Sequence, residues 1–138
     1  MAGTAIELKN AIAAALAASP DVTSLVGDRI YEYAQTGEAE FPFIALDGIE
    51  ETDDSTDCLK ASDAFVTING WSKPATPSFD EAYELVDAIR AALHQAELTL
   101  ATNRCVLLEH ATSKPLLDSD PPPVYRARVT FHAIVEEM

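Results

Sequence analysis

The sequence of 138 residues has few basic side chains and no long apolar run. Lys and Arg total 9 against 23 Asp and Glu, so the formal net charge is −14 at pH 7. Phosphate contacts need clustered Lys and Arg, so this balance argues against a nucleic-acid-binding surface and against an anionic membrane surface. No stretch reaches the roughly 18–20 apolar residues that span a bilayer. Lys9 is the only early base, and no long apolar run follows it, so no secretory signal is expected.

Residues that build disulfides and metal centres are also scarce. Cys58 and Cys105 are too few for a disulfide scaffold, and we expect two reduced, packed thiols. A bridge between them and a Cys–His nucleophile pair are the open alternatives. The histidines, His94, His110 and His132, are not spaced at i, i+3 or i, i+4, and no Cys-x-x-Cys is present. The sequence therefore predicts no metal and no cofactor.

Motifs of catalysis are missing as well. The sequence has five glycines and contains no nucleophile elbow, no phosphate-binding glycine loop and no dinucleotide fingerprint. Asp118 and Asp120 flank Ser119, and residues of these types commonly cap turns. We therefore expect that the chain is not an enzyme.

Two segments have the apolar period of amphipathic helices. Residues 4–18 begin with Thr4 and Glu7 in the spacing of a capping box, and an alanine-rich apolar stripe follows. Residues 78–94 begin with Ser78 and Glu81 in the same spacing and carry a wider apolar stripe. A short helical turn is expected over 22–26, between Pro20 and Gly27.

Alternation of apolar and polar residues predicts the strands. The clearest are 61–71 and 125–135, and shorter strands are expected at 29–33, 41–46, 98–100 and 104–112. Connections too short for crossovers imply mainly antiparallel pairing. No linker or repeat interrupts residues 1–138, so one domain is expected. The predicted fold is α+β, a two-layer sandwich in which two amphipathic helices cover one face of a mainly antiparallel sheet.

Residues 47–57 hold six acids and no base. Asp53, Ser55 and Asp57 alternate as calcium ligands do, but no glycine follows and no glutamate closes the loop. We expect a solvated or partner-facing acidic loop. Its candidate interface residues are Glu50, Glu51, Asp53 and Asp54.

Two further groups are candidates for an interface. Trp71 ends a predicted strand before a proline-rich loop that contains Lys73; it is either a core or rim aromatic or an anchor at an interface. Arg126 and Arg128 project from the polar face of the last strand. They lie either on a solvated face or against carboxylates of a neighbouring copy.

Several segments, in order, resemble the tail-completion or tail-terminator family of long-tailed phages and gene transfer agents. The segments that carry the resemblance are Ile12-Ala-Ala-Ala-Leu16, Pro20-Asp21-Val22, Leu25-Val26-Gly27-Asp28-Arg29-Ile30-Tyr31, Phe41-Pro42-Phe43-Ile44 and Val66-Thr67-Ile68-Asn69-Gly70-Trp71-Ser72. The 78–94 helix and the last strand follow in the expected order. One departure is Pro121-Pro122-Pro123, which stands where the family often has a glycine-containing turn.

The resemblance implies a structural role in a virion that is assembled in a bacterial host. Such subunits form a ring, usually a hexamer, at the head-proximal end of the tail. The ring ends polymerisation of the tail tube and joins the tail to the head connector or stopper protein. Its implied partners are further copies of the chain, the tube protein and the connector. DNA would pass through the lumen without specific binding.

Two other functions are alternatives to the terminator ring. The first is a neighbouring head-closure or connector adaptor. The second is a free acidic binding module whose affinity for a basic partner would depend steeply on salt.

Overall fold

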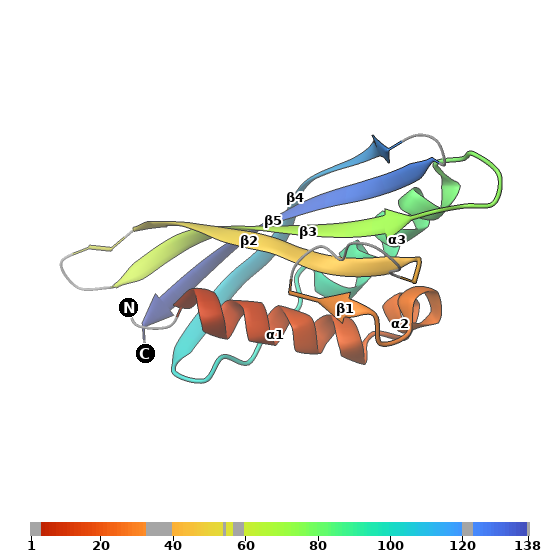
Figure 1. The fold of residues 1–138 in the computed structure, drawn as a ribbon. Coiled ribbons are helices and arrows are strands. Elements are labelled where there is room, and N and C mark those ends of the chain that lie inside the picture. The colour runs from red at the N-terminus through yellow and green to blue at the C-terminus, as the bar shows by residue number, and fades with distance from the viewer. Residues whose placement is uncertain (1–3, 33–39, 54, 57–59, 120–122, 138) are drawn as a thin grey trace.

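The computed structural model describes residues 4–32, 40–53, 55–56, 60–119 and 123–137 (Figure 1). Its helices are α1 (Thr4–Ala18), α2 (Pro20–Val26) and α3 (Asp80–Leu93). Its strands are β1 (Ile30–Tyr31), β2 (Phe43–Asp53), β3 (Ala61–Ser72), β4 (Asn103–Ser119) and β5 (Val124–Glu137). No helix in these ranges is long and apolar enough to cross a membrane.

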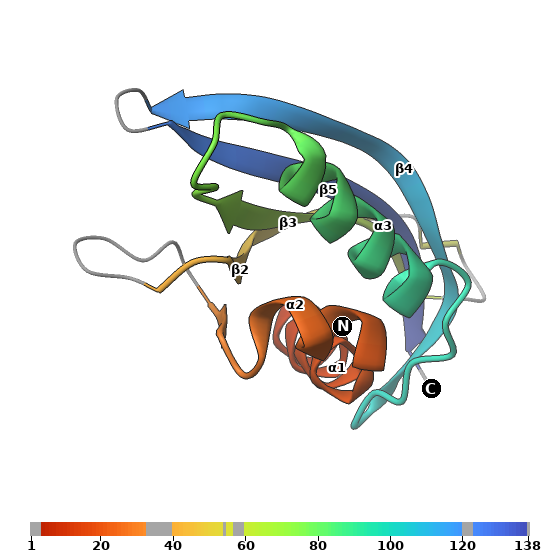
Figure 2. The ribbon, with the colours of Figure 1, turned by 90° about the vertical axis from the view of Figure 1, so that its right-hand side faces the viewer.

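The five strands form one sheet in the order β1-β2-β3-β5-β4. Only the β1–β2 pair is parallel; the other pairs are antiparallel. The sheet curves around the helices, which all lie on its concave side (Figure 2). The α+β prediction is confirmed, with one correction: three helices pack on the sheet rather than two. Residues 20–26 form a complete helix because Pro20 occupies its first turn and Gly27, at φ 61°, ends it.

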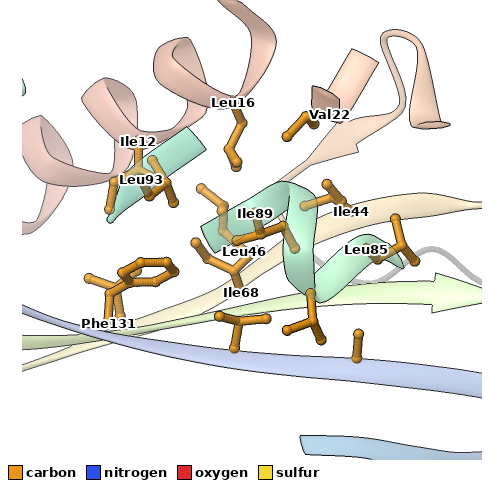
Figure 3. Packing of buried hydrophobic residues seen from close by; sticks show 14 of the residues in the cluster. Ile12, Leu16, Val22, Ile44, Leu46, Ile68, Leu85, Ile89, Leu93 and Phe131 are labelled. Atoms are coloured by element: carbon orange, nitrogen blue, oxygen red, sulfur yellow. The ribbon is translucent and has the colours of Figure 1, made fainter. Parts of the chain in front are cut away.

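The core fills the space between the helices and the concave face (Figure 3). Ile12 and Leu16 of α1 face Ile89 of α3, while Ile68 and Phe131 rise from the sheet. All five side chains are fully buried. Burial of each such side chain stabilises the fold by about 1.5–3 kcal/mol.

Gly70 allows α3 to lie close to β3. A Cβ atom at this position would be 3.1 Å from Cδ1 of Leu85 and 3.3 Å from its Cβ. Such contacts are tighter than ordinary van der Waals packing, so a larger residue would push the helix outward.

Both predicted capping boxes are corrected. The carboxylate of Glu7 accepts hydrogen bonds from Thr102 and Asn103 at the start of β4. The carboxylate of Glu81 accepts a 2.6 Å hydrogen bond from the Ser72 hydroxyl. In each case the glutamate takes a tertiary partner in place of the local one. The Ser78 half of the second box is retained, because the Asp80 backbone N–H donates a 3.1 Å hydrogen bond to the Ser78 hydroxyl at the start of α3.

Three predicted boundaries are wrong. Residues 47–53 continue β2 instead of starting a loop, because after a register shift at 46–48 they pair with β3. Residues 113–119 continue β4 because β5 offers them partners along its whole length. Residues 98–100 form no strand; Leu98 and Leu100 pack against the core from an irregular segment.

Of the two cysteines, Cys105 is a half-buried free thiol. Burial raises the pKa of this thiol above its ordinary value, which favours the protonated, unreactive form. Cys58 lies outside the described residues.

Candidate protein–protein interface

The convex face of the sheet faces away from all three helices (Figure 2). Alternation on β5 places Arg126, Arg128 and His132 on this face, because Ala127 and Val129 between them enter the core. On β3 the cross-strand partners of these three residues are Trp71, Asn69 and Phe65, so they share the face. Of the predicted interface residues, Trp71, Arg126 and Arg128 lie on this face with Glu50, whereas Glu51 and Asp53 alternate to the other face.

An aromatic cluster covers one end of the convex face. Trp71 and Phe43 are cross-strand partners, and their rings stack with centroids 5.1 Å apart. Phe41 and Tyr31 pack against Phe43 at centroid distances of 5.2 and 5.8 Å. Trp71 is only 8% exposed. Trp71 is therefore mainly a packing residue under the neighbouring side chains of this face. Its role as an interface anchor stays a prediction.

Asp118 connects this cluster to β5. The Trp71 indole Nε1 donates a 3.4 Å hydrogen bond to one carboxylate oxygen, and Arg126 Nε lies 3.6 Å from the other. Asp118 sits at a register shift in β4, between residues 117 and 119. The prediction that Asp118 caps a turn is wrong, because β4 continues through it. Asp120 lies outside the described residues.

Four basic side chains lie along this end of the sheet; we call Lys73, Lys114, Arg126 and Arg128 the basic patch. Lys73 follows β3, with its Nζ 5.9 Å from the centroid of the Phe41 ring. Lys114 on β4 is the direct cross-strand partner of Arg128. Sequence reasoning missed Lys114, because its position opposite Arg128 depends on the β4–β5 register.

Acidic side chains occupy the opposite region of the sheet. We call residues 47–53 of β2 the acidic limb; its carboxylates belong to Asp47, Glu50, Glu51 and Asp53. All four residues are exposed. Hydrogen bonds from Ser55 lower the pKa of Asp53. The remaining predicted residue, Asp54, lies outside the described part of the chain.

The limb extends beyond the helices and has one free side. The described ends of β2 and β3 reach past the N-terminal end of α1 (Figure 1). β1 pairs only with Ile44 and Ala45. Within the described residues, no strand covers that side of β2 from residue 46 to residue 53. The limb is therefore accessible to another molecule.

His132 and three side chains around it form a polar cluster between the basic patch and the far end of the face. His132 Nε2 is 3.1 Å from Asp63 Oδ1, and its Nδ1 is 3.7 Å from Glu109 Oε1. The imidazole stacks on Phe65 at a centroid distance of 5.0 Å. This arrangement orients the ring within the sheet surface. Sequence spacing gave no signal for it, because the four residues come from three strands.

The cavities of the described structure are shallow. A mostly apolar hollow of about 200 Å³ lies between α1 and β2, lined by residues such as Ile6, Leu46 and Ile49. The 2.8 Å ion pair between Lys9 and Glu32 stands at its rim.

Comparisons with known proteins agree with the fold. A chain from a solved structure described as the virion of a native gene transfer agent particle matches with a TM-score of 0.84 and 24% sequence identity. The match covers 94% of this chain and 95% of that chain, and at this identity it shows the fold. No curated protein matches the sequence. Residues 10–136 match the family described as "Tail completion protein gp17". The chain therefore belongs to the tail completion protein gp17 family.

Proposed function

We propose that the chain is a ring subunit that caps the tail tube, ends its polymerisation and joins the tail to the head connector. The family match over residues 10–136 is the observation that carries the proposal, because it takes in every strand of the sheet. Membership in this structural family also means that the chain is not an enzyme. The fold shared with a chain from a gene transfer agent virion supports a place in a particle.

The surface of the chain is suited to ring formation. A ring requires heterologous contacts, in which one patch meets a different patch on the next copy. This chain has a basic patch and an acidic limb at separate places on one sheet. In the proposal the ring's further partners are the tube protein below it and the connector or stopper protein above it.

We also propose that residues 1–138 act as a single domain. The one sheet takes strands from residue 30 to residue 137, and α1 and α3 share its core. No part of the described chain has a separate apolar core on the concave side, so the subunit would move and assemble as one body.

Electron microscopy of particles made without this protein tests the function. We expect tail tubes of uncontrolled length that carry no heads, because nothing ends polymerisation or offers a joining surface. Restoring the wild-type chain should restore uniform tails with heads. Tubes of normal length joined to heads in its absence would contradict the proposal.

Labelling the protein on intact particles distinguishes the terminator from the adaptor. The label should lie at the head-proximal end of the tube and should persist on tails detached from heads. A label that stays with the heads after detachment would instead assign the chain to the head connector.

A further inference from the structure

We propose that the acidic limb of one copy docks on the basic patch of the next copy, and that this contact joins the subunits of the ring. The inference rests on the proposed ring function and adds the surfaces that meet. The occupant of the convex face is thus a second copy of this chain, engaged through residues 47–53.

The basic patch lacks sufficient compensation within one copy. Lys114 and Arg128 stand directly opposite each other, and like charges in that position destabilise a sheet. Asp118 is the only carboxylate that pairs with the patch among the described residues, and it pairs with Arg126. The patch therefore keeps a local positive charge in a chain whose net charge is −14.

The carboxylates of the acidic limb likewise lack partners of opposite charge within one copy. None of its four carboxylates takes part in an ion pair within the described ranges. Glu50 and Glu51 are exposed on opposite faces of β2. A docking partner can therefore reach carboxylates from either side of the strand.

Glu50 of the limb and Arg128 of the patch lie far apart in a single copy. Glu50 pairs with Phe65 and Arg128 pairs with Asn69, so they are four residues apart along β3, which corresponds to about 13 Å. They also lie on β2 and β5, with β3 between them. Hydrogen-bonded strands hold this separation, so Glu50 can pair with Arg128 only between copies.

The chemistry of the patch favours a protein carboxylate over a nucleic acid. The patch has only four cations, and one of them, Arg126, is already paired with Asp118. The surrounding charge of −14 would repel a polyanion at long range. A short acidic strand of an identical chain would bring only a few carboxylates to the patch, whereas a nucleic acid would bring a long row of phosphates.

Paired charge reversals test the contact. The patch variant Lys114→Glu/Arg128→Glu changes exposed residues that have no ion pair in the described structure, so the fold should survive. The limb variant is Glu50→Lys/Glu51→Lys. We expect each variant alone to lose association by at least about 100-fold, because like charges then face each other at the contact. Analytical ultracentrifugation over a concentration series measures association, and circular dichroism confirms folding.

Net charge cannot explain the expected pattern. Each reversal changes the net charge by two, so the patch variant carries −14 − 4 = −18 and the limb variant −14 + 4 = −10. If total repulsion decided assembly, the limb variant would associate better than the wild type. We expect it to fail as the patch variant does.

An equal mixture of the two variants is the decisive sample. The reversed patch of one then meets the reversed limb of the other, and the native patch meets the native limb, so assembly should return. A chain carrying all four substitutions should also assemble. As a control, Arg90→Glu at an exposed position of α3 changes the net charge as Arg128→Glu does and should leave association unchanged.

The outcomes separate this inference from the proposed function. Wild-type rings with unaffected variants, or with no recovery in the mixture, would overturn the contact and leave the ring function standing. A wild type that stays monomeric at every concentration would overturn the self-docking, while the tail-length experiment still decides the function. If the wild type bound a labelled DNA duplex and formed no oligomer, and the patch variant lost the DNA binding, the self-docking would be overturned in favour of a nucleic acid.

Discussion

Glu7 links two parts of the chain that are distant in sequence. Its carboxylate accepts hydrogen bonds from the backbone of Thr102 at 2.8 Å and of Asn103 at 3.1 Å, and from the Thr102 hydroxyl. These hydrogen bonds lower the pKa of Glu7, because they favour its ionised form. The side chain thereby fastens the first turn of α1 to the start of β4.

Glu7→Gln should lower stability at neutral pH and weaken the effect of acid. Because the folded pKa of Glu7 lies below its unfolded pKa, its contribution is complete above the unfolded pKa and is lost as the pH falls toward the folded value. Urea denaturation from about pH 6 to about pH 3 should therefore show a smaller loss of stability in the variant than in the wild type. Glu84→Gln, at an exposed position of α3, is the control. Equal midpoints for Glu7→Gln and wild type at every pH would contradict this role.

The two border strands of the sheet carry features that disfavour pairing with further strands. β4 spans 17 residues at the border of the sheet and contains three register shifts as well as Pro115. Bulges and prolines interrupt the regular hydrogen-bonding edge that another strand would need. The free side of β2 carries carboxylates instead. Both devices disfavour open-ended strand pairing.

The helix α3 packs on the sheet through one apolar face. Ile89 is fully buried against the sheet, while the adjacent Arg90 is exposed. Ile89→Ala should lower the free energy of unfolding by about 2–5 kcal/mol, because it removes buried apolar groups and leaves a cavity. Chemical denaturation measures this difference.

Two matched variants complete that series. Ile89→Val should cost only about 0.5–1.5 kcal/mol, because it removes a single methylene. Arg90→Ala should change stability by less than about 0.5 kcal/mol. Similar losses for Ile89→Ala and Arg90→Ala would show that α3 does not pack on the sheet through this face.

At the scale of the whole molecule, two electrostatic effects oppose each other. Copies that each carry −14 repel one another over long distances. The proposed limb–patch contact attracts at short distance. Salt distinguishes the two, because the Debye length falls from about 30 Å at 0.01 M to about 3 Å at 1 M.

Association of the wild type should therefore be strongest at intermediate ionic strength. Moderate salt screens the long-range repulsion first, and high salt then weakens the contact pairs. Light scattering across a salt series should show association that rises and then falls. The chain with all four reversals keeps the net charge of −14 and should follow the same curve. Association that increases steadily up to 1 M salt would show an apolar contact instead.

Local patterns in the sequence determined the fold class and most elements. The alternation in 61–71 and 125–135 and the apolar stripes of 4–18 and 78–94 depend only on neighbouring residues, and the structure has a strand or helix at each. The ordered motifs from Ile12 to Ser72 likewise identified the family, which the match over residues 10–136 confirmed.

Tertiary structure decided the features that depend on pairing between distant segments. Residues 47–53 became a strand because β3 offered partners, and Trp71 became buried because Phe43 stands opposite it. Glu7 turned to β4, and Lys114 came to face Arg128, through contacts that no local period encodes. Register between strands is set by the packing of the entire sheet, so the arrangement of charge on the convex face emerges only when all five strands are in place.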